Sequence, residues 1–374
     1  MKKNFLMMAA AVMAALALTS CEETNSTPWL KPVVTSDGVF VINNGNEWVG
    51  TNGSLTYYDY DTKTATQDVY LAKNGVSLGS TPNHAIVYGS KIYIVGSGEK
   101  TVFVADKNTM RKVKNIKMEV KGEPVTPRQA VAGYGYVFVS TFSNTVIAID
   151  TITNTIATTY RSGDYSEGMA INGAYLYVAN SNYGRGKEEN ARPSISAINI
   201  NKDDTVMFVS DKLHNPIDVK VVNGRIFVLD SGTYDEDGTQ KDAGLYEIEN
   251  NRLVFRAAAT EMAVGGTKIF LINAPFIGSE LAVPTYTVYE TTNNRSTTLC
   301  EGTEIEYPSK ISVDAVKGYV YITAYHIGSN GFPDYNTPGY CVIYDAKGNK
   351  QGSFYCGIGP GYVVPNLSVD YVQM

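Results

Sequence analysis

Charged residues are sparse in this chain, and neither sign dominates. Asp, Glu, Lys and Arg make up only 18% of the 374 residues, and the net charge is −6. A nucleic-acid-binding domain needs a basic stripe that contacts phosphates, and the sequence contains none. Nucleic acid is therefore excluded from the expected partners.

Cysteine and histidine are also scarce. The chain has four cysteines and three histidines, and it has no Cys-x-x-Cys pair. His84, His214 and His326 are too far apart in sequence for the short ligand spacing of common zinc motifs. A nucleophile elbow and a Gly-rich phosphate loop are missing too. We therefore expect no metal site, no catalytic cofactor and no catalytic residues.

Long apolar runs are absent apart from one near the N-terminus. Lys2 and Lys3 precede the apolar run 5–18, which is too short to span a bilayer permanently and is typical of a signal peptide. The run ends at Leu18-Thr-Ser-Cys21, which resembles a bacterial lipobox, and this resemblance implies cleavage before Cys21 and its acylation. We predict a signal peptide at 1–20, a lipid-anchored tether at 21–36 and one folded domain at 37–374.

Two of the remaining cysteines flank a predicted hairpin. Cys341 and Cys356 lie symmetrically about Gly348-Asn349 and would face each other across two strands. An exported protein permits a disulfide there. Two buried thiols are an equal alternative.

What the sequence does contain is a repeat. A Gly-containing turn followed by an alternating aromatic and β-branched run occurs seven times, and the aromatic anchors lie 39 to 53 residues apart. These anchors are Phe40, Tyr93, Phe138, Tyr177, Phe227, Phe270 and Tyr321. A period of about 40–50 residues built from strands and turns is typical of a β-propeller. We predict an all-β, seven-bladed propeller of four-stranded antiparallel blades.

Ring closure follows from the two ends of the repeat. The first repeat begins at the second strand of a blade, near Val39, and lacks an inner strand. The segment 362–372 can supply it, which would remove two exposed strand edges. We therefore expect a C-terminal strand to close the ring.

The repeat Pro-x-x-[Ala/Ile/Val]…Gly-x-x-[Tyr/Phe]-Val…[Val/Ile]-x-x-Asp resembles that of YncE-like seven-bladed propellers. Together with the lipoprotein start, it is similar to surface propeller lipoproteins of Bacteroidetes of the BtuG type. This resemblance implies a protein anchored at the outer membrane and exposed at the cell surface. Such proteins capture vitamin B12 and pass it to a TonB-dependent transporter. Cobalamin or cobinamide is therefore the expected ligand.

Loop lengths predict which face of the ring binds. Five long insertions all connect the second and third strands of a blade, at 43–54, 180–194, 230–244, 273–285 and 324–340. These connections lie on one rim of a propeller, and long loops on one side of a rigid scaffold favour a binding surface. The candidate ligand-binding residues on this face are Asn43, Asn44, Trp48, His84, Arg128, Asn180, Tyr183, Arg185, Tyr234, Phe276, Tyr325, His326, Phe332 and Tyr335.

The chemistry of these residues leaves more than one ligand open. Aromatic rings provide contact area at low entropic cost, while Asn and Arg can bind amides or phosphate. A corrinoid fits this chemistry, and so does a glycan. A third alternative is an enzyme resembling streptogramin lyase, in which His84 or His214 would act with Glu167.

Overall fold

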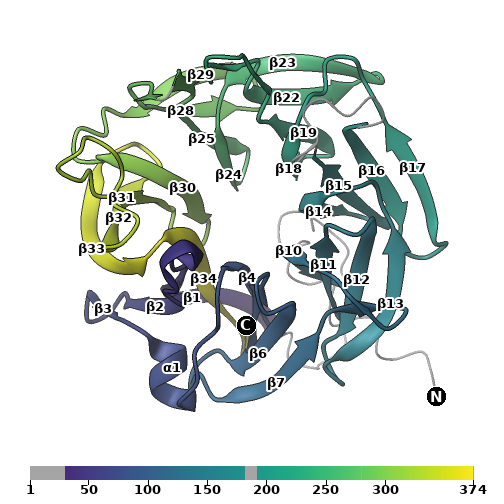
Figure 1. Ribbon diagram of the computed structural model, residues 1–374. Coiled ribbons are helices and arrows are strands. Elements are labelled where there is room, and N and C mark those ends of the chain that lie inside the picture. The colour runs from purple at the N-terminus through teal and green to yellow at the C-terminus, as the bar shows by residue number, and fades with distance from the viewer. Residues whose placement is uncertain (1–29, 182–191, 279, 374) are drawn as a thin grey trace.

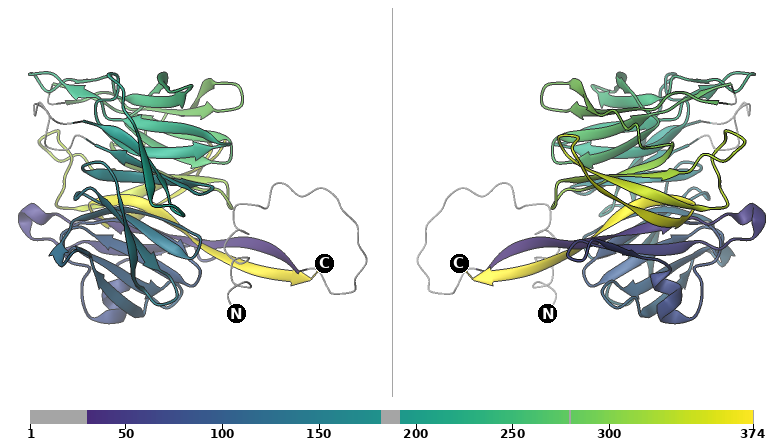
Figure 2. Two further views of the ribbon diagram at one scale, coloured as in Figure 1. Left: turned by 90° about the vertical axis from the view of Figure 1, so that its right-hand side faces the viewer. Right: turned by 90° about the vertical axis from the view of Figure 1, so that its left-hand side faces the viewer.

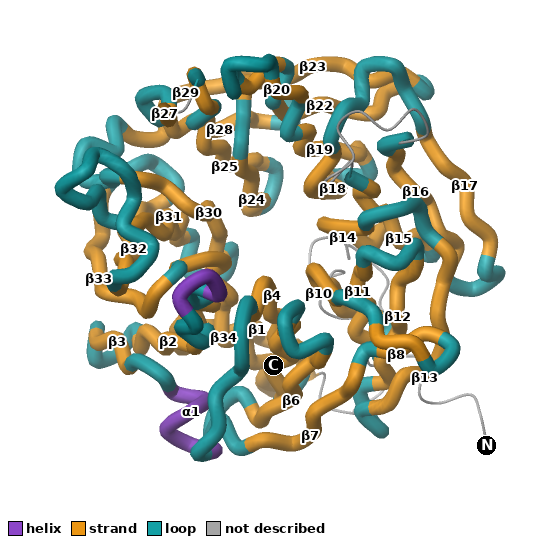
Figure 3. Tube along the Cα trace, viewed as in Figure 1, coloured by secondary structure: helices purple, strands orange, loops and turns teal. Residues whose placement is uncertain are grey.

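The computed structural model is a closed ring of seven antiparallel sheets around a central axis (Figure 1). It describes residues 30–181, 192–278 and 280–373. Most of the ring is strand, as Figure 3 shows, and the predicted all-β, seven-bladed propeller is confirmed. None of the helices in the described ranges is long and apolar enough to cross a membrane.

Each blade contains four strands, and the first strand of each blade lies nearest the axis. From the axis outward, blade 1 contains β34 (Pro360–Gln373), β1 (Leu30–Asn43), β2 (Ser54–Asp59) and β3 (Thr64–Thr66). Blade 2 contains β4 (Pro82–Tyr88), β5 (Lys91–Gly96), β6 (Thr101–Asp106) and β7 (Lys112–Lys117). Blade 3 contains β10 (Pro127–Gly133), β11 (Tyr136–Thr141), β12 (Thr145–Asp150) and β13 (Thr155–Arg161). Blade 4 contains β14 (Ser166–Asn172), β15 (Tyr175–Asn180), β16 (Ser194–Asn199) and β17 (Asp204–Phe208).

The other three blades follow the same order. Blade 5 contains β18 (Pro216–Val222), β19 (Arg225–Asp230), β22 (Gly244–Glu249) and β23 (Arg252–Ala258). Blade 6 contains β24 (Glu261–Gly265), β25 (Lys268–Asn273), β28 (Thr285–Glu290) and β29 (Arg295–Cys300). Blade 7 contains β30 (Tyr307–Asp314), β31 (Tyr319–Tyr325), β32 (Pro338–Asp345) and β33 (Lys350–Ile358).

Short elements lie in the connections. They are the 3-10 helix η2 (Glu47–Val49), the helix α1 (Val69–Asn74) and the strand pairs β8 (Glu119–Val120) with β9 (Glu123–Pro124), β20 (Thr233–Tyr234) with β21 (Gln240–Lys241), and β26 (Phe276–Ile277) with β27 (Glu280–Leu281).

The hydrophobic core lies between neighbouring blades. Phe138 of blade 3, for example, packs in one cluster with Met169 and Val178 of blade 4. Alternation of apolar residues along each strand places one set of side chains against each neighbouring blade. The anchors Phe40, Tyr93, Phe138, Phe227, Phe270 and Tyr321 are buried in these clusters. The repeated aromatic is therefore a packing residue in the ring.

The C-terminal strand closes the ring as expected. In blade 1, β34 pairs antiparallel with β1, so that Val39, Phe40 and Val41 lie opposite Pro365, Val364 and Val363. The pairing also extends toward the N-terminus to Leu30. Residues 30–36, which the sequence assigned to the tether, therefore belong to a strand, because β34 continues past the ring and offers them a partner.

The two hairpin cysteines are free, buried thiols. Cys341 lies opposite Phe354, two residues from Cys356, and register shifts at Ile343/Tyr344 and Pro338/Tyr340 displace the pairing from the symmetry of the sequence. Of the two alternatives that the sequence left open, the structure has the unbonded one. Burial raises the pKa of both thiols.

Candidate functional site

The described parts of the five long loops lie on one rim of the ring, as the sequence predicts. Each connects the second and third strands of its blade, between β1 and β2, β15 and β16, β19 and β22, β25 and β28, and β31 and β32. Figure 2 shows the described parts of these loops on the same side of the disc. The opposite rim has mostly tight turns, such as Asp106 to Thr109, where the carboxylate accepts the Thr109 N–H at 2.8 Å.

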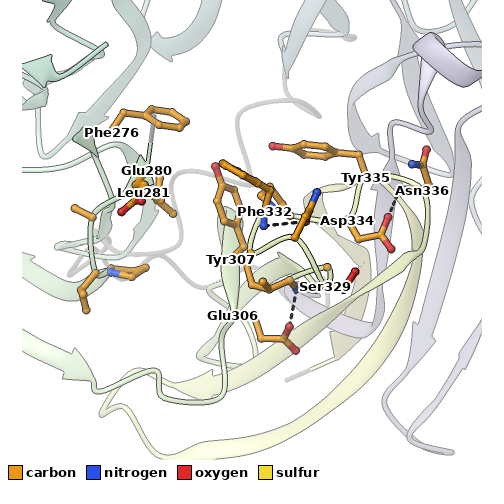
Figure 4. A pocket seen from close by; sticks show the side chains of 18 residues that line it. Phe276, Glu280, Leu281, Glu306, Tyr307, Ser329, Phe332, Asp334, Tyr335 and Asn336 are labelled. Atoms are coloured by element: carbon orange, nitrogen blue, oxygen red, sulfur yellow. Dashed lines mark hydrogen bonds between the residues drawn. The ribbon is translucent and has the colours of Figure 1, made fainter. Parts of the chain in front are cut away.

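A cleft with a volume of about 1200 Å³ lies on the loop rim between blades 6 and 7. We call it the rim cleft. One wall is the β26–β27 loop, and the other is the loop 326–337 together with the start of β30. Four aromatic rings line it, and Figure 4 shows three of them, Tyr307, Phe332 and Tyr335, on the side opposite Phe276.

The loop 326–337 is braced from within and from the side. Gly328 N donates to the carbonyl of Phe332 at 2.8 Å, and Asp334 N donates to the carbonyl of His326 at 2.8 Å. The Tyr335 ring meets Tyr325 edge-on, with centroids 5.0 Å apart. Asn46 of the blade 1 loop donates to Asn336 Oδ1 at 3.0 Å. These contacts hold the aromatic wall in place without a ligand.

The rim cleft is acidic. Its lining includes Glu280, Glu306 and Asp334, and no Lys or Arg is among the described lining residues. Glu306 accepts the Ile327 N–H at 2.7 Å and lies 2.8 Å from His326 Nδ1. Burial by itself raises the pKa of Glu306, but these two contacts outweigh it and leave the pKa lowered. The carboxylate is therefore ionised at neutral pH, and the cleft favours ligands that donate hydrogen bonds or carry positive charge.

A second group of polar side chains lines the axis of the ring. Arg128 Nε on β10 donates to Glu167 Oε2 on β14 at 3.1 Å, and Lys220 Nζ lies 2.8 Å from Asp218 Oδ2 on β18. Lys310 on β30 forms an ion pair with Glu261 on β24. We call these six residues, with His84 and Tyr362, the axial ring. Arg128–Glu167 links blades 3 and 4 and Lys310–Glu261 links blades 6 and 7 where their inner strands converge, whereas the Lys220–Asp218 pair lies within β18.

His84 and Tyr362 complete the axial ring between blades 1 and 2. Their rings meet edge-on with centroids 5.0 Å apart, and His84 Nδ1 accepts the Ala130 N–H at 3.4 Å. Burial, assisted by the charge of Lys220, lowers the pKa of His84 to about 3. The imidazole is therefore neutral at physiological pH. His84 lies within the inner strand β4, which begins at Pro82.

Two of the candidate asparagines are structural. Asn43 donates to Ser54 Oγ at 3.0 Å and to Thr56 Oγ1 at 2.9 Å, and its oxygen accepts the Gly357 N–H at 3.0 Å. Asn180 is equivalent in blade 4, because it donates to Ser194 Oγ and Ser196 Oγ at 3.0 and 2.8 Å. Both are fully buried. Their amides fasten the second strand of a blade to the third and are not accessible to a ligand.

The other candidates divide between three places. Phe276, Phe332 and Tyr335 line the rim cleft, with Tyr325 and His326 directly behind its wall. His84 and Arg128 lie in the axial ring, where Glu167, the lyase candidate, is held by Arg128. Asn44, Trp48 and Tyr234 are on the loop rim but outside the cleft lining, and Trp48 is 97% exposed. Tyr183, Arg185 and Cys21 lie outside the described residues.

Sequence reasoning missed most of the polar groups in both places. In the cleft these are Glu280, Glu306, Tyr307, Asp334 and Asn336, and in the axial ring they are Asp218, Lys220, Glu261, Lys310 and Tyr362. For three of these residues the sequence contains a recognisable pattern. Asp218, Lys310 and Tyr362 each occupy the position two residues after the proline that opens the inner strand. In the described ranges no three His, Cys, Asp or Glu residues are grouped so as to hold a metal ion.

Comparisons with other proteins support the fold. A family model described as a domain of unknown function, DUF5074, matches residues 37–353. No curated protein matches the sequence. Hydrazine synthase of Kuenenia stuttgartiensis is similar in structure, with a TM-score of 0.58 and 15% identity over 78% of this chain and 95% of its own. The WD40 repeats of RRP9 are similar with a TM-score of 0.50 and 9% identity over 76% and 80%. At these identities the likeness concerns the fold alone.

Proposed function

This chain belongs to the DUF5074 family, and we propose that it is a surface lipoprotein that captures a corrinoid non-covalently in the rim cleft. The observation that carries the proposal is the cleft itself. Its volume of about 1200 Å³ exceeds the roughly 300–1,000 Å³ typical of small-molecule sites. This volume supports a large ligand.

The lining supports a ligand with a broad apolar body and many amide donors. A corrin ring can pack against Phe276, Phe332 and Tyr335, and its amide side chains can donate to Glu280, Glu306 and Asp334. The closed ring and the braced loop mean that little ordering is needed on binding, which favours affinity.

The acidic lining also bears on which corrinoid binds better. Cobalamin carries a phosphate in its lower-ligand nucleotide, whereas cobinamide does not. No Lys or Arg among the described lining residues compensates this phosphate. Electrostatic repulsion therefore favours cobinamide, or a pose that keeps the nucleotide outside the cleft.

The anchor and the partner rest on the sequence. The lipobox-like Leu18-Thr-Ser-Cys21 supports acylation at Cys21 and attachment at the outer membrane, with the protein exposed at the cell surface. The YncE-like and BtuG-type resemblance supports transfer of the corrinoid to a TonB-dependent transporter.

A glycan is the second candidate, because the same lining favours it. Sugar rings stack on aromatic side chains, and their hydroxyls donate to carboxylates. A glycan has no phosphate to be repelled by the three acids. The two candidates differ in ligand alone, and the same titration separates them.

The test is calorimetry on residues 22–374 with cyanocobalamin, cobinamide and a panel of oligosaccharides. We expect micromolar or tighter binding of a corrinoid, and Phe332→Ala should weaken it about tenfold, or ~1.4 kcal/mol, since it removes one wall of the cleft. Tyr234→Ala is the matched control, because Tyr234 is an exposed aromatic of the same rim outside the cleft. Binding of oligosaccharides alone would favour the glycan as the ligand. Equal effects of both variants would show that the ligand does not bind in the rim cleft.

A further inference from the structure

Strands β1 and β34 continue past the ring as a two-stranded ribbon. Their pairing extends from Leu30 opposite Gln373 to Ser36 opposite Leu367, whereas β2 pairs with β1 only from Gly38 onward. Figure 2 shows this ribbon, formed by residues 30–36 and 367–373, projecting from one face of the disc. The described loops of the rim cleft lie on the opposite face. The ribbon therefore points away from the cleft.

One face of the ribbon is apolar. Pro32 lies opposite Tyr371, and Val34 lies opposite Val369, so these four side chains share a face. Tyr371 is 52% exposed and Val369 is 39% exposed. The other face is mixed, with Thr35 opposite Ser368, Val33 opposite Asp370 and Lys31 opposite Val372. The ribbon therefore has one apolar face, on which Val369 and Tyr371 are exposed and Pro32 and Val34 are half-buried, and one mixed face.

An uncovered ribbon of this kind needs a partner. A two-stranded sheet is marginally stable in water, and exposed strand edges with apolar side chains favour association. Among the described strands, none pairs with the outer edges of residues 30–36 or 367–373. The described hydrophobic clusters of the ring include none of residues 30–36 and 367–373, but the base of the ribbon is bonded to the ring, because Ser36 donates to Asp314 Oδ2 at 2.5 Å and Lys107 donates to Ser368 Oγ at 2.7 Å.

The number of residues between Cys21 and Leu30 limits how far the ribbon can lie from the lipid. Cys21 precedes Leu30 by nine residues, and a fully extended chain of nine residues spans at most about 30 Å. If Cys21 is acylated, as proposed above, the ribbon tip is held within that distance of the lipid. Tethering raises the effective concentration of the bilayer at the ribbon far above that of any untethered partner.

We propose that the ribbon is a membrane-contacting foot: its apolar face rests in the lipid interface, and the rim cleft is turned outward. The proposal rests on the acyl anchor of the proposed function. Tyrosine is enriched at membrane–water interfaces, where Tyr371 would lie, and Lys31 at the tip would meet anionic headgroups. The paired ribbon is stiffer than a free tether and so fixes the orientation of the disc.

Depth-dependent fluorescence quenching tests this orientation. The chain has two tryptophans, Trp29 and Trp48, and Trp48 is fully exposed in η2 on the cleft face. The full-length acylated protein is reconstituted into phosphatidylethanolamine–phosphatidylglycerol vesicles with brominated acyl chains. One reporter carries Trp29→Phe and keeps Trp48. The other carries Trp29→Phe, Trp48→Phe and Tyr371→Trp.

The ribbon reporter should lose about half of its emission, because interfacial groups lie about 5–10 Å into the lipid boundary. The Trp48 reporter should be unchanged. Quenching of Trp48 alone, or of neither reporter, would contradict membrane contact by the ribbon. Mass spectrometry of the same samples reports acylation. An unmodified Cys21 would contradict the lipid anchor of the proposed function, independently of the quenching result. Equal melting temperatures of the reporters and wild type show that Tyr371→Trp leaves the fold intact.

Discussion

Lys310 and Glu261 form an ion pair across the boundary between blades 6 and 7, inside the axial ring. Their side chains are 28% and 17% exposed, so both charges are largely removed from water. Burial by itself lowers the pKa of Lys310, but the Glu261 carboxylate outweighs it and the pKa is raised. Lys310 therefore stays protonated at neutral pH, while burial raises the pKa of Glu261, and the contact links two inner strands that are distant in sequence.

Breaking this pair should destabilise the ring. Lys310→Met leaves the Glu261 carboxylate without its partner, and removing one member of a buried pair typically costs about 3–5 kcal/mol. Thermal and urea denaturation measure the loss. The double variant Lys310→Met/Glu261→Gln removes both charges and should recover most of it. A double variant as unstable as the single one would show that packing, and not the unpaired charge, causes the effect.

His84 makes a distinct contribution to pH dependence. Its folded pKa of about 3 is below the unfolded value of about 6.5, so the stability that it contributes is present above pH 6.5 and is lost as the pH falls toward 3. The slope reaches at most about 1.4 kcal/mol per pH unit. Lys220 and Tyr362 face His84, and the buried Glu167, whose pKa is raised, titrates with the opposite sign.

The variant His84→Gln isolates this contribution, because its amide does not titrate and can still accept the Ala130 N–H. Urea denaturation at pH 7 and pH 4.5 should show a smaller loss of stability for the variant than for wild type. Identical losses would contradict the lowered pKa of His84.

Ring closure predicts a sharp difference between two truncations. A chain that stops after Gly359 lacks β34 and exposes the edge of β1, so it should aggregate and lose its cooperative melting transition. A chain that stops after Ser368 keeps the pairs between Val39–Val41 and Val363–Pro365 and removes only the ribbon tip. Its melting temperature should stay within about 5 °C of wild type. Soluble, cooperative folding of the shorter chain would contradict closure by β34.

The sequence predicts the ring because the pattern of its strands repeats along the chain. Alternation around anchors such as Phe40 and Tyr321 indicates strands, and the missing first inner strand indicates closure by the C-terminal segment. Register is not periodic: the β-bulges near Cys341 shift its partner by two residues and could not be read from residue spacing. The repeat also cannot show that Lys310 meets Glu261, since only the closed ring brings their strands together.

The candidate site, like the fold, could be predicted only in part. Loop lengths indicate the rim on which the cleft lies, and Phe332 and Tyr335 are candidates from sequence because large rings on loops suggest contact surfaces. Asn43 and Asn180 have the same sequence signature as binding amides, yet their hydrogen bonds are used inside the blade. The acidity of the rim cleft depends on two loops from different blades meeting, which no local pattern encodes.

The charge of the rim cleft gives a final prediction, which concerns selectivity. Glu280 is on β27, faces the aromatic wall formed by Phe332 and Tyr335, and is exposed, so Glu280→Gln removes a charge at little cost to folding (Figure 4). We expect cobalamin, with its phosphate, to gain about two- to fivefold in affinity at low salt, while cobinamide gains nothing. The gain should shrink at 0.5 M NaCl, where charges are screened within about 4–5 Å.

Glu236→Gln is the matched control, since Glu236 lies on the same rim outside the cleft lining. Calorimetry with both ligands and both variants measures the ratio. A glutamine at 280 can still accept from the corrin amides, so an equal change for cobinamide would show that Glu280 does not act through its charge on the phosphate.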